Sequence, residues 1–176
     1  MNLAEHTVVT TRPVAPQDVV RFVRLWTRLS PDTVYRRFHA PIRQLPATEL
    51  RRLLDVDHDL REAIVAVVRD EVVGVARYDR PPDDLDNATF AVVVEDAWQG
   101  RGLGRRLLSE LTELAGSRGV HGFTASVQAD NRRMLRLVRL MFPGSRWTVD
   151  HGVWEIRGPI PLPSAYERPA WTATAA

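Results

Sequence analysis

The sequence contains no cysteine among its 176 residues. This absence excludes disulfide bonds, thiolate metal sites and cysteine nucleophiles. A chain that needs no disulfide suits a reducing compartment, so we expect a cytoplasmic protein. The five histidines show no spacing that is typical of metal ligands, and we expect no metal centre.

Long apolar runs are also absent. No stretch approaches the roughly 18 consecutive apolar residues that a membrane-spanning helix requires. The segment 1–12 carries charges and lacks the apolar region of a signal peptide. The sequence therefore predicts a protein that is not exported by a signal peptide and has no membrane partner.

Charge of one sign is nearly balanced by the other, with 24 basic and 22 acidic side chains and a formal net charge of +2. So small an excess argues against nucleic acid as a partner. The length of 176 residues fits a single hydrophobic core. We expect one domain over 1–162 and a disordered tail over 163–176, where proline and small residues accumulate.

The periodicity of apolar residues predicts a mixed α/β fold, because valine-rich runs alternate with segments of helical spacing. The predicted strands are 8–12, 63–68, 72–78, 89–94, 123–127, 147–149 and 153–156. The predicted helices are 16–29, 103–116 and 131–141, with short ones at 32–38 and 48–54. The order strand, glycine-rich turn, helix, strand from 89 to 127 predicts a right-handed parallel crossover.

The glycine-rich turn carries the chemical signal. Gly100, Gly102 and Gly104 follow an apolar strand and open a helix, so backbone N–H groups can converge without obstruction by side chains. The helix N-terminus adds partial positive charge, and Arg101 and Arg105 add full charges. The turn lacks the lysine and hydroxyl of a P-loop and the spacing of a dinucleotide loop. It therefore predicts a phosphate or pyrophosphate site, with a helix start that binds nothing as the alternative.

The segment Gln99-Gly100-Arg101-Gly102-Leu103-Gly104 resembles the Gln/Arg-x-x-Gly-x-Gly/Ala signature of the GNAT acetyltransferase superfamily, in the strand-to-helix context of that family. The resemblance covers about residues 8–157. It implies a GNAT fold with a mixed central sheet of six to seven strands, about four flanking helices and a cofactor cleft between two splayed parallel strands. It also implies transfer of acetyl from acetyl-CoA, as co-substrate, to a primary amine by direct attack.

The same resemblance implies which residues contact acetyl-CoA. Backbone of Val92 and Val94 would pair with the pantetheine arm, residues 100–105 would hold the pyrophosphate, and Asn131 would contact the arm. A helix N-cap is the alternative role of Asn131. The implied cofactor-binding residues are Val92, Val93, Val94, Gln99, Gly100, Arg101, Gly102, Leu103, Gly104, Arg105 and Asn131.

A narrower resemblance concerns the acceptor. The segments 29–38, 57–59, 90–94 and 131–137 are similar to the acetyltransferase domain of bacterial protein lysine acetyltransferases. This similarity implies a protein lysine as the amine. A small-molecule amine and a non-catalytic acyl-CoA sensor are the alternatives. The oligomeric state is open, with a dimer as one option.

An amine must lose a proton to attack a thioester, so a base is required. Many relatives place a glutamate on the central strand, where this sequence reads Ala88-Thr89-Phe90. Glu95, directly after the strand, is our candidate catalytic base, with a solvated loop carboxylate as the alternative. The tyrosine that often protonates the leaving thiolate falls at Val138. The backbone N–H of Val94 is the candidate donor to the thioester carbonyl.

Overall fold

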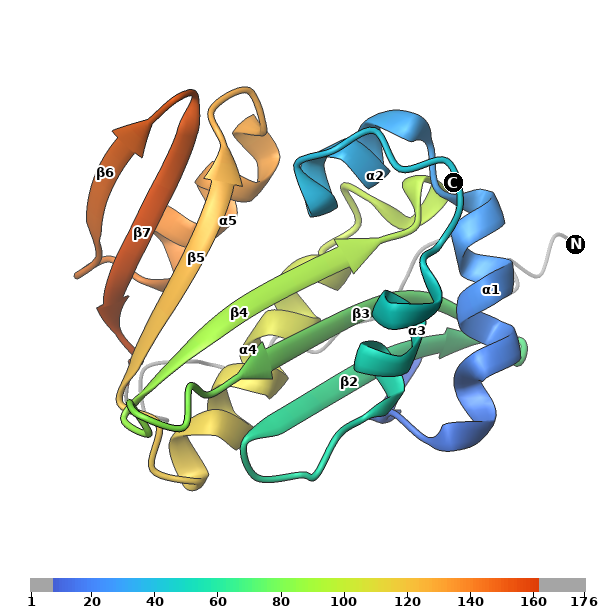
Figure 1. Ribbon diagram of the computed structural model, residues 1–176, viewed down its shortest axis with the longest axis horizontal. Helices are drawn as coiled ribbons and strands as arrows, with labels where there is room; N and C mark the ends of the chain where they lie inside the picture. The colour runs from blue at the N-terminus through green and yellow to red at the C-terminus, as the bar shows by residue number, and fades with distance from the viewer. Residues whose placement is uncertain (1–7, 162–176) are drawn as a thin grey trace, which may run out of the picture.

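The computed structural model describes residues 8–161, and the predicted tail at 163–176 lies outside the described residues. A seven-stranded mixed sheet crosses the molecule in the order β1-β2-β3-β4-β5-β7-β6 (Figure 1). The strands are β1 (Thr10–Pro13), β2 (Arg61–Val68), β3 (Glu71–Asp79), β4 (Asn87–Val94), β5 (Gly122–Gln128), β6 (Arg146–Asp150) and β7 (Val153–Pro159). The predicted α/β fold is confirmed.

Helices cover both faces of this sheet (Figure 1). One layer contains α1 (Val19–Arg28), α2 (Pro31–Phe38) and α3 (Ala47–Leu54), and the other contains α4 (Leu103–Ser117) and α5 (Arg132–Met141). Two 3-10 turns, η1 (Pro16–Asp18) and η2 (Asp96–Trp98), precede α1 and the glycine-rich turn, so the predicted helix 16–29 consists of η1 and α1. Within residues 8–161, no helix combines the length and the apolar character that crossing a bilayer requires.

Two apolar cores result from the alternation of side chains along the strands. On one face, Phe90 of β4 packs in a cluster with residues of α4 and α5 such as Leu107 and Leu135. On the other face, Val93 packs against a cluster that includes Phe22 and Leu25 of α1. Even-numbered residues of β4 therefore face α4 and α5, and odd-numbered residues face the layer of α1, α2 and α3.

The two parallel strands β4 and β5 separate along their length. They pair only where Asn87–Thr89 meets Gly122–Thr124. Beyond that point β4 stays paired with β3 as far as Val94, while β5 stays paired with β7 as far as Gln128. Figure 1 shows the two strands diverging toward their carboxyl ends. The splay that the sequence led us to expect is present, and it leaves one backbone edge of β4 facing a gap.

Candidate functional site

A cleft of about 510 Å³ occupies the space between the splayed strands. Its walls come from β4, β5, α2, α5 and the glycine-rich turn with the first residues of α4. All but one of the residues predicted to bind the cofactor line it: Val92, Val93, Val94, Gln99, Gly100, Gly102, Leu103, Gly104, Arg105 and Asn131. The structure thus gathers segments from Thr33 to Leu140, far apart in the sequence, into one site.

The glycine-rich turn has a conformation that depends on two of its glycines. Gly100 and Gly102 have φ of 75° and 82°, in the left-handed region that side chains with a Cβ disfavour. Gly102 is the N-cap of α4, and the first intrahelical bond runs from the N–H of Arg106 to its carbonyl at 3.0 Å. The N–H groups of residues 103–105 precede that bond and have no intrahelical acceptor. They are available to an anion at the cleft.

Arginines give the cleft a positive charge. Arg105 lines it beside the glycine-rich turn. The other lining arginines are Arg133 and Arg136 of α5 and Arg36 and Arg37 of α2. None of the cleft-lining residues within 8–161 is an Asp, Glu, His or Tyr. Guanidinium groups and free helix N–H groups together form a suitable environment for phosphate oxygens.

Arg101 is the one predicted cofactor-binding residue that is not among those lining the cleft. Its guanidinium carbon lies 5.3 Å from the centre of the Trp98 ring, a cation–π distance. The next residue is Gly102, at which the chain turns into α4. Of the two arginines predicted beside the turn, Arg105 therefore lines the cleft and Arg101 lies against Trp98.

Gln99 connects three parts of the site. Its Nε2 donates to the carbonyl of Val94 at 3.0 Å and to Oγ1 of Thr33 at 3.1 Å, and its Oε1 accepts from Arg133 at 3.0 Å. These bonds join the end of β4 to α2 and to α5. Both the nitrogen and the oxygen of the Gln99 amide thus bond to protein groups, and these bonds hold the walls of the cleft in place.

Asn131 caps α5. Its Oδ1 accepts the N–H of Met134 at 3.2 Å, so the N-cap role is observed. The residue also lines the cleft. Its contact with the arm of the cofactor stays a prediction.

Glu95 follows the lining residue Val94 but does not itself line the cleft, and it exposes 9% of its surface. Its Oε2 accepts from Nε of Arg28 at 3.1 Å, on the α1 side of the sheet. The sequence could not show this pair, because Arg28 is 67 positions away. A carboxylate that is ion-paired outside the cleft is poorly placed to take a proton from an amine inside it, so this geometry disfavours Glu95 as the base.

The closed end of the splay carries hydroxyl groups. Oγ1 of Thr89 lies 3.0 Å from Oγ1 of Thr124, at the last paired position of β4 and β5. Val138 of α5 is 1% exposed and packs in the core. Neither Thr89 nor Val138, the positions at which the family resemblance implies catalytic side chains, is an acid or a base.

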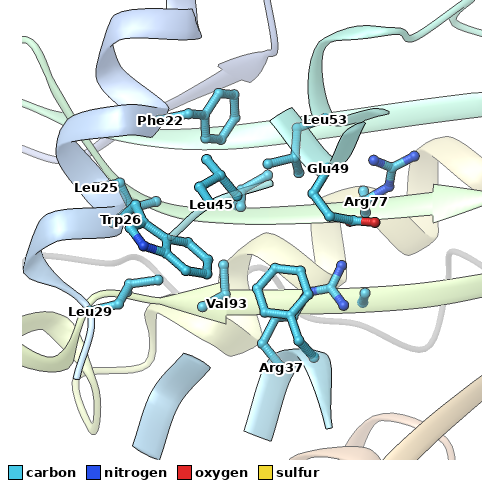
Figure 2. A pocket seen from close by; sticks show the side chains of 13 residues that line it. Phe22, Leu25, Trp26, Leu29, Arg37, Leu45, Glu49, Leu53, Arg77 and Val93 are labelled. Carbon is cyan, nitrogen blue, oxygen red and sulfur yellow. The ribbon is translucent and has the colours of Figure 1, made fainter. Parts of the chain in front are cut away.

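A smaller cavity of about 30 Å³ adjoins the cleft between α1, α2 and α3 (Figure 2). Trp26 and Leu29 form its apolar side, and Glu49 and Arg77 lie at its polar side. Arg37 lines both this cavity and the cleft. Burial, with a contribution from the nearby charge of Arg77, lowers the pKa of Arg37 to about 10, so the guanidinium stays charged at neutral pH.

The residues that α2 contributes were not predicted. Thr33, Arg36 and Arg37 line the cleft although they precede the glycine-rich turn by more than 60 positions. Ser126 of β5 was also missed. Ser126 lies within the predicted strand 123–127, but the sequence does not show which face of the sheet its side chain occupies. That face is fixed by the pairing of β5 with β4.

Comparison with known proteins identifies related chains. The sequence profile of the acetyltransferase (GNAT) family matches residues 22–142. Acetyltransferase Pat of Mycolicibacterium smegmatis is 34% identical over 131 residues, which are 72% of this chain and 38% of Pat. Acetyltransferase PA5475 of Pseudomonas aeruginosa is 32% identical over 143 residues, which are 78% of this chain and 76% of that protein.

A solved structure agrees with this relationship. The GNAT domain of S. lividans PAT superposes with a TM-score of 0.78 and 26% sequence identity. The match covers 90% of this chain and 99% of that domain. The chain therefore spans about a whole GNAT domain, but only 38% of the length of the Pat protein that it matches.

Proposed function

The chain belongs to the acetyltransferase (GNAT) family of acyltransferases, and from this premise we propose that it transfers acetyl from acetyl-CoA to the amine of a protein lysine by direct attack. The observation that supports acetyl-CoA most directly is the cleft at the splay of β4 and β5. It combines left-handed glycines, free N–H groups of a helix start and an arginine-rich wall.

The residues present fit a nucleotide thioester. An added Cβ would meet no atom within 4 Å at Gly100, so the turn leaves open space where phosphate oxygens would approach the backbone. N–H groups of residues 103–105 and the guanidinium of Arg105 would hold the pyrophosphate. Arg133 and Arg136 lie on the same cleft and would neutralise further phosphate charge.

The reacting end of acetyl-CoA supplies a thioester whose carbonyl carbon bonds to the amine nitrogen as the carbon–sulfur bond breaks. The part of this chain is to orient and polarise that group. The edge of β4 beyond Thr89 has no pairing with β5, so backbone of Val92 and Val94 would pair with the pantetheine arm. We assign the donor role toward the carbonyl oxygen to the N–H of Val94.

The acceptor is proposed from relatives and from the shape of the site. Pat and PA5475 are named acetyltransferases, and the S. lividans neighbour is the GNAT domain of a PAT protein. In Figure 1 the helices α1 and α3 lie in front of β2 and β3, and α2 lies next to the end of β4, while no described helix lies in front of β5 and β7. This uncovered face would admit a side chain as long as lysine from the surface of another protein.

The test is incubation with acetyl-CoA and a panel of lysine peptides, polyamines and aminoglycosides, followed by mass spectrometry. We expect one acetyl group on the lysine peptides, and calorimetry should show weaker binding of acetyl-pantetheine, which lacks the nucleotide phosphates. Transfer to a polyamine or an aminoglycoside, with none to the lysine peptides, would show that the acceptor is a small-molecule amine and not a protein lysine. Tight binding of acetyl-CoA without release of free thiol would favour an acyl-CoA sensor, for which the absence of a lining carboxylate within residues 8–161 is the supporting observation.

A further inference from the structure

The proton that leaves the amine needs an acceptor, and no lining residue within 8–161 is a carboxylate. Among the described residues, four carboxylates each contact a residue that lines the cleft. Asp96 contacts Thr33, Asp32 and Asp130 contact Arg36, and Glu155 contacts Ser126.

Three of these four carboxylates are held by several hydrogen bonds or by an ion pair. The Asp96 carboxylate accepts the N–H and the hydroxyl of Ser30 and the hydroxyl of Thr33, at 2.7 to 2.9 Å. Burial opposes the ionised form of Asp96, but these bonds outweigh it and lower the pKa. Asp32 and Asp130 form ion pairs with Arg36, at 3.2 and 4.0 Å. Asp96, stabilised as an anion, is thus a weak proton acceptor, and Asp32 and Asp130 are each held by a guanidinium.

Glu155 has a different setting. It lies on β7 directly opposite Ser126 of β5, and its Oε2 accepts the Ser126 hydroxyl at 2.9 Å. It is half-buried, and no ion pair to it occurs within residues 8–161. Its carboxylate therefore contacts the cleft through the hydroxyl of Ser126 and is not held by a guanidinium among the described residues.

Ser126 lies on the face of the sheet toward α1, at the opening between β4 and β5. Thr89 and Val93 share the face of β4 toward α1, and Thr89 contacts Thr124 across the closed end of the splay. Ser126 follows Thr124 by two residues, so it lies on the same face one step further into the opening. The strand of Thr89, β4, carries no carboxylate over Asn87–Val94. Here the opposite wall of the same opening carries a serine backed by a glutamate.

We propose that Ser126 and Glu155 accept the proton of the amine, in place of a glutamate on β4. This inference rests on the proposed function. In this step the hydroxyl of Ser126, a cleft-lining residue, takes a proton from the substrate ammonium while it gives its own proton to Oε2 of Glu155. The ammonium thus becomes a neutral amine and Glu155 a carboxylic acid. Of the two protons that the nitrogen loses overall, one reaches Glu155 and then solvent, and the other ends on the thiol of CoA.

Other charges near Glu155 are mostly basic. Arg157 shares its face of β7 two residues away, and Arg146 and Asp150 flank its partner Thr148 on β6. From α2, Arg36 lines the cleft on the other side. The pH dependence of the rate is therefore compared between the original protein and Glu155→Gln, in which these neighbouring charges are unchanged.

The test compares Glu155→Gln with Glu110→Gln, which removes a carboxylate from α4 on the opposite face. A positioned base contributes roughly 100-fold or more to rate, so Glu155→Gln should lower kcat about 100-fold while Glu110→Gln keeps it. Ser126→Ala should also lower kcat. In Glu155→Gln the rate should rise with pH up to the pKa of the free amine. Thr89→Glu added to Glu155→Gln should restore activity by returning a carboxylate to the closed end.

Calorimetry with acetyl-CoA and thermal unfolding are measured on the same variants without turnover. Unchanged affinity and stability together with the lost rate support the proposal. A wild-type rate and pH profile in Glu155→Gln would overturn the proton path alone, leaving the acetyltransferase intact. If the unmodified protein binds acetyl-CoA but transfers to no amine, the proposed function fails, and the proton path with it.

Discussion

The two glycines at the start of α4 should respond in opposite ways to alanine. Gly102 has φ of 82°, and an L-residue in the left-handed region costs about 1 to 2 kcal/mol. Gly104 lies inside α4, where an added Cβ would meet Leu137 and Val94 at 3.7 Å, an ordinary contact distance. Alanine is favoured over glycine in a helix, so Gly104→Ala should stabilise the fold by about 0.5 kcal/mol.

The two variants should therefore differ by about 2 kcal/mol in unfolding free energy, which is roughly 4 to 8 °C in Tm for a chain of this size. Urea unfolding and thermal melts measure this difference. Calorimetry should show acetyl-CoA binding about tenfold weaker in Gly102→Ala, equivalent to about 1.4 kcal/mol, because leaving the left-handed conformation moves the N–H groups of residues 103–105. Gly104→Ala should bind as the original does. Equal stability and equal affinity of the two variants would refute the role assigned to Gly102.

Three further predictions concern charge. Arg136→Gln should weaken acetyl-CoA binding and reduce the dependence of that binding on salt in calorimetry, because Arg136 lines the cleft. Arg139→Gln should leave binding unchanged, because Arg139, three residues later in α5, lies 4.7 Å from the Trp147 ring and does not line the cleft. Asp18→Asn should cost about 3 kcal/mol in urea unfolding, because the fully buried carboxylate holds the Arg12 guanidinium through two bonds of 2.7 Å. Burial opposes ionisation of Asp57, but bonds from nearby N–H groups and a guanidinium lower its pKa from 3.8 to about 2. Its stabilisation is thus complete above the unfolded value and lost as pH falls toward 2, and Asp57→Asn should flatten that part of a stability–pH curve.

The sequence was informative where the chemistry is local. The turn from Gly100 to Gly104 requires glycine for its backbone angles, so its conformation and its helix follow from neighbouring residues. The splay of β4 from β5 followed from the family resemblance that the same turn carries. Periodicity placed the strands and helices, because burial of one face imposes a regular spacing.

Pairs formed across the fold could not be predicted. Arg28 reaches Glu95 from α1, and Glu155 meets Ser126 only because β7 inserts between β5 and β6. The occupied amide of Gln99 depends likewise on where α2 and α5 pack. Side-chain roles at the site were thus set by long-range packing, which a single sequence does not encode in any local pattern.

We propose above all that this chain moves acetyl from acetyl-CoA to a lysine amine. Mass spectrometry of a lysine peptide after incubation with acetyl-CoA and the protein tests it most directly. The account predicts one added acetyl group on the lysine side chain, with release of an equal amount of CoA thiol. Recovery of unmodified peptide and intact acetyl-CoA, under conditions where calorimetry shows the cleft saturated, would contradict it.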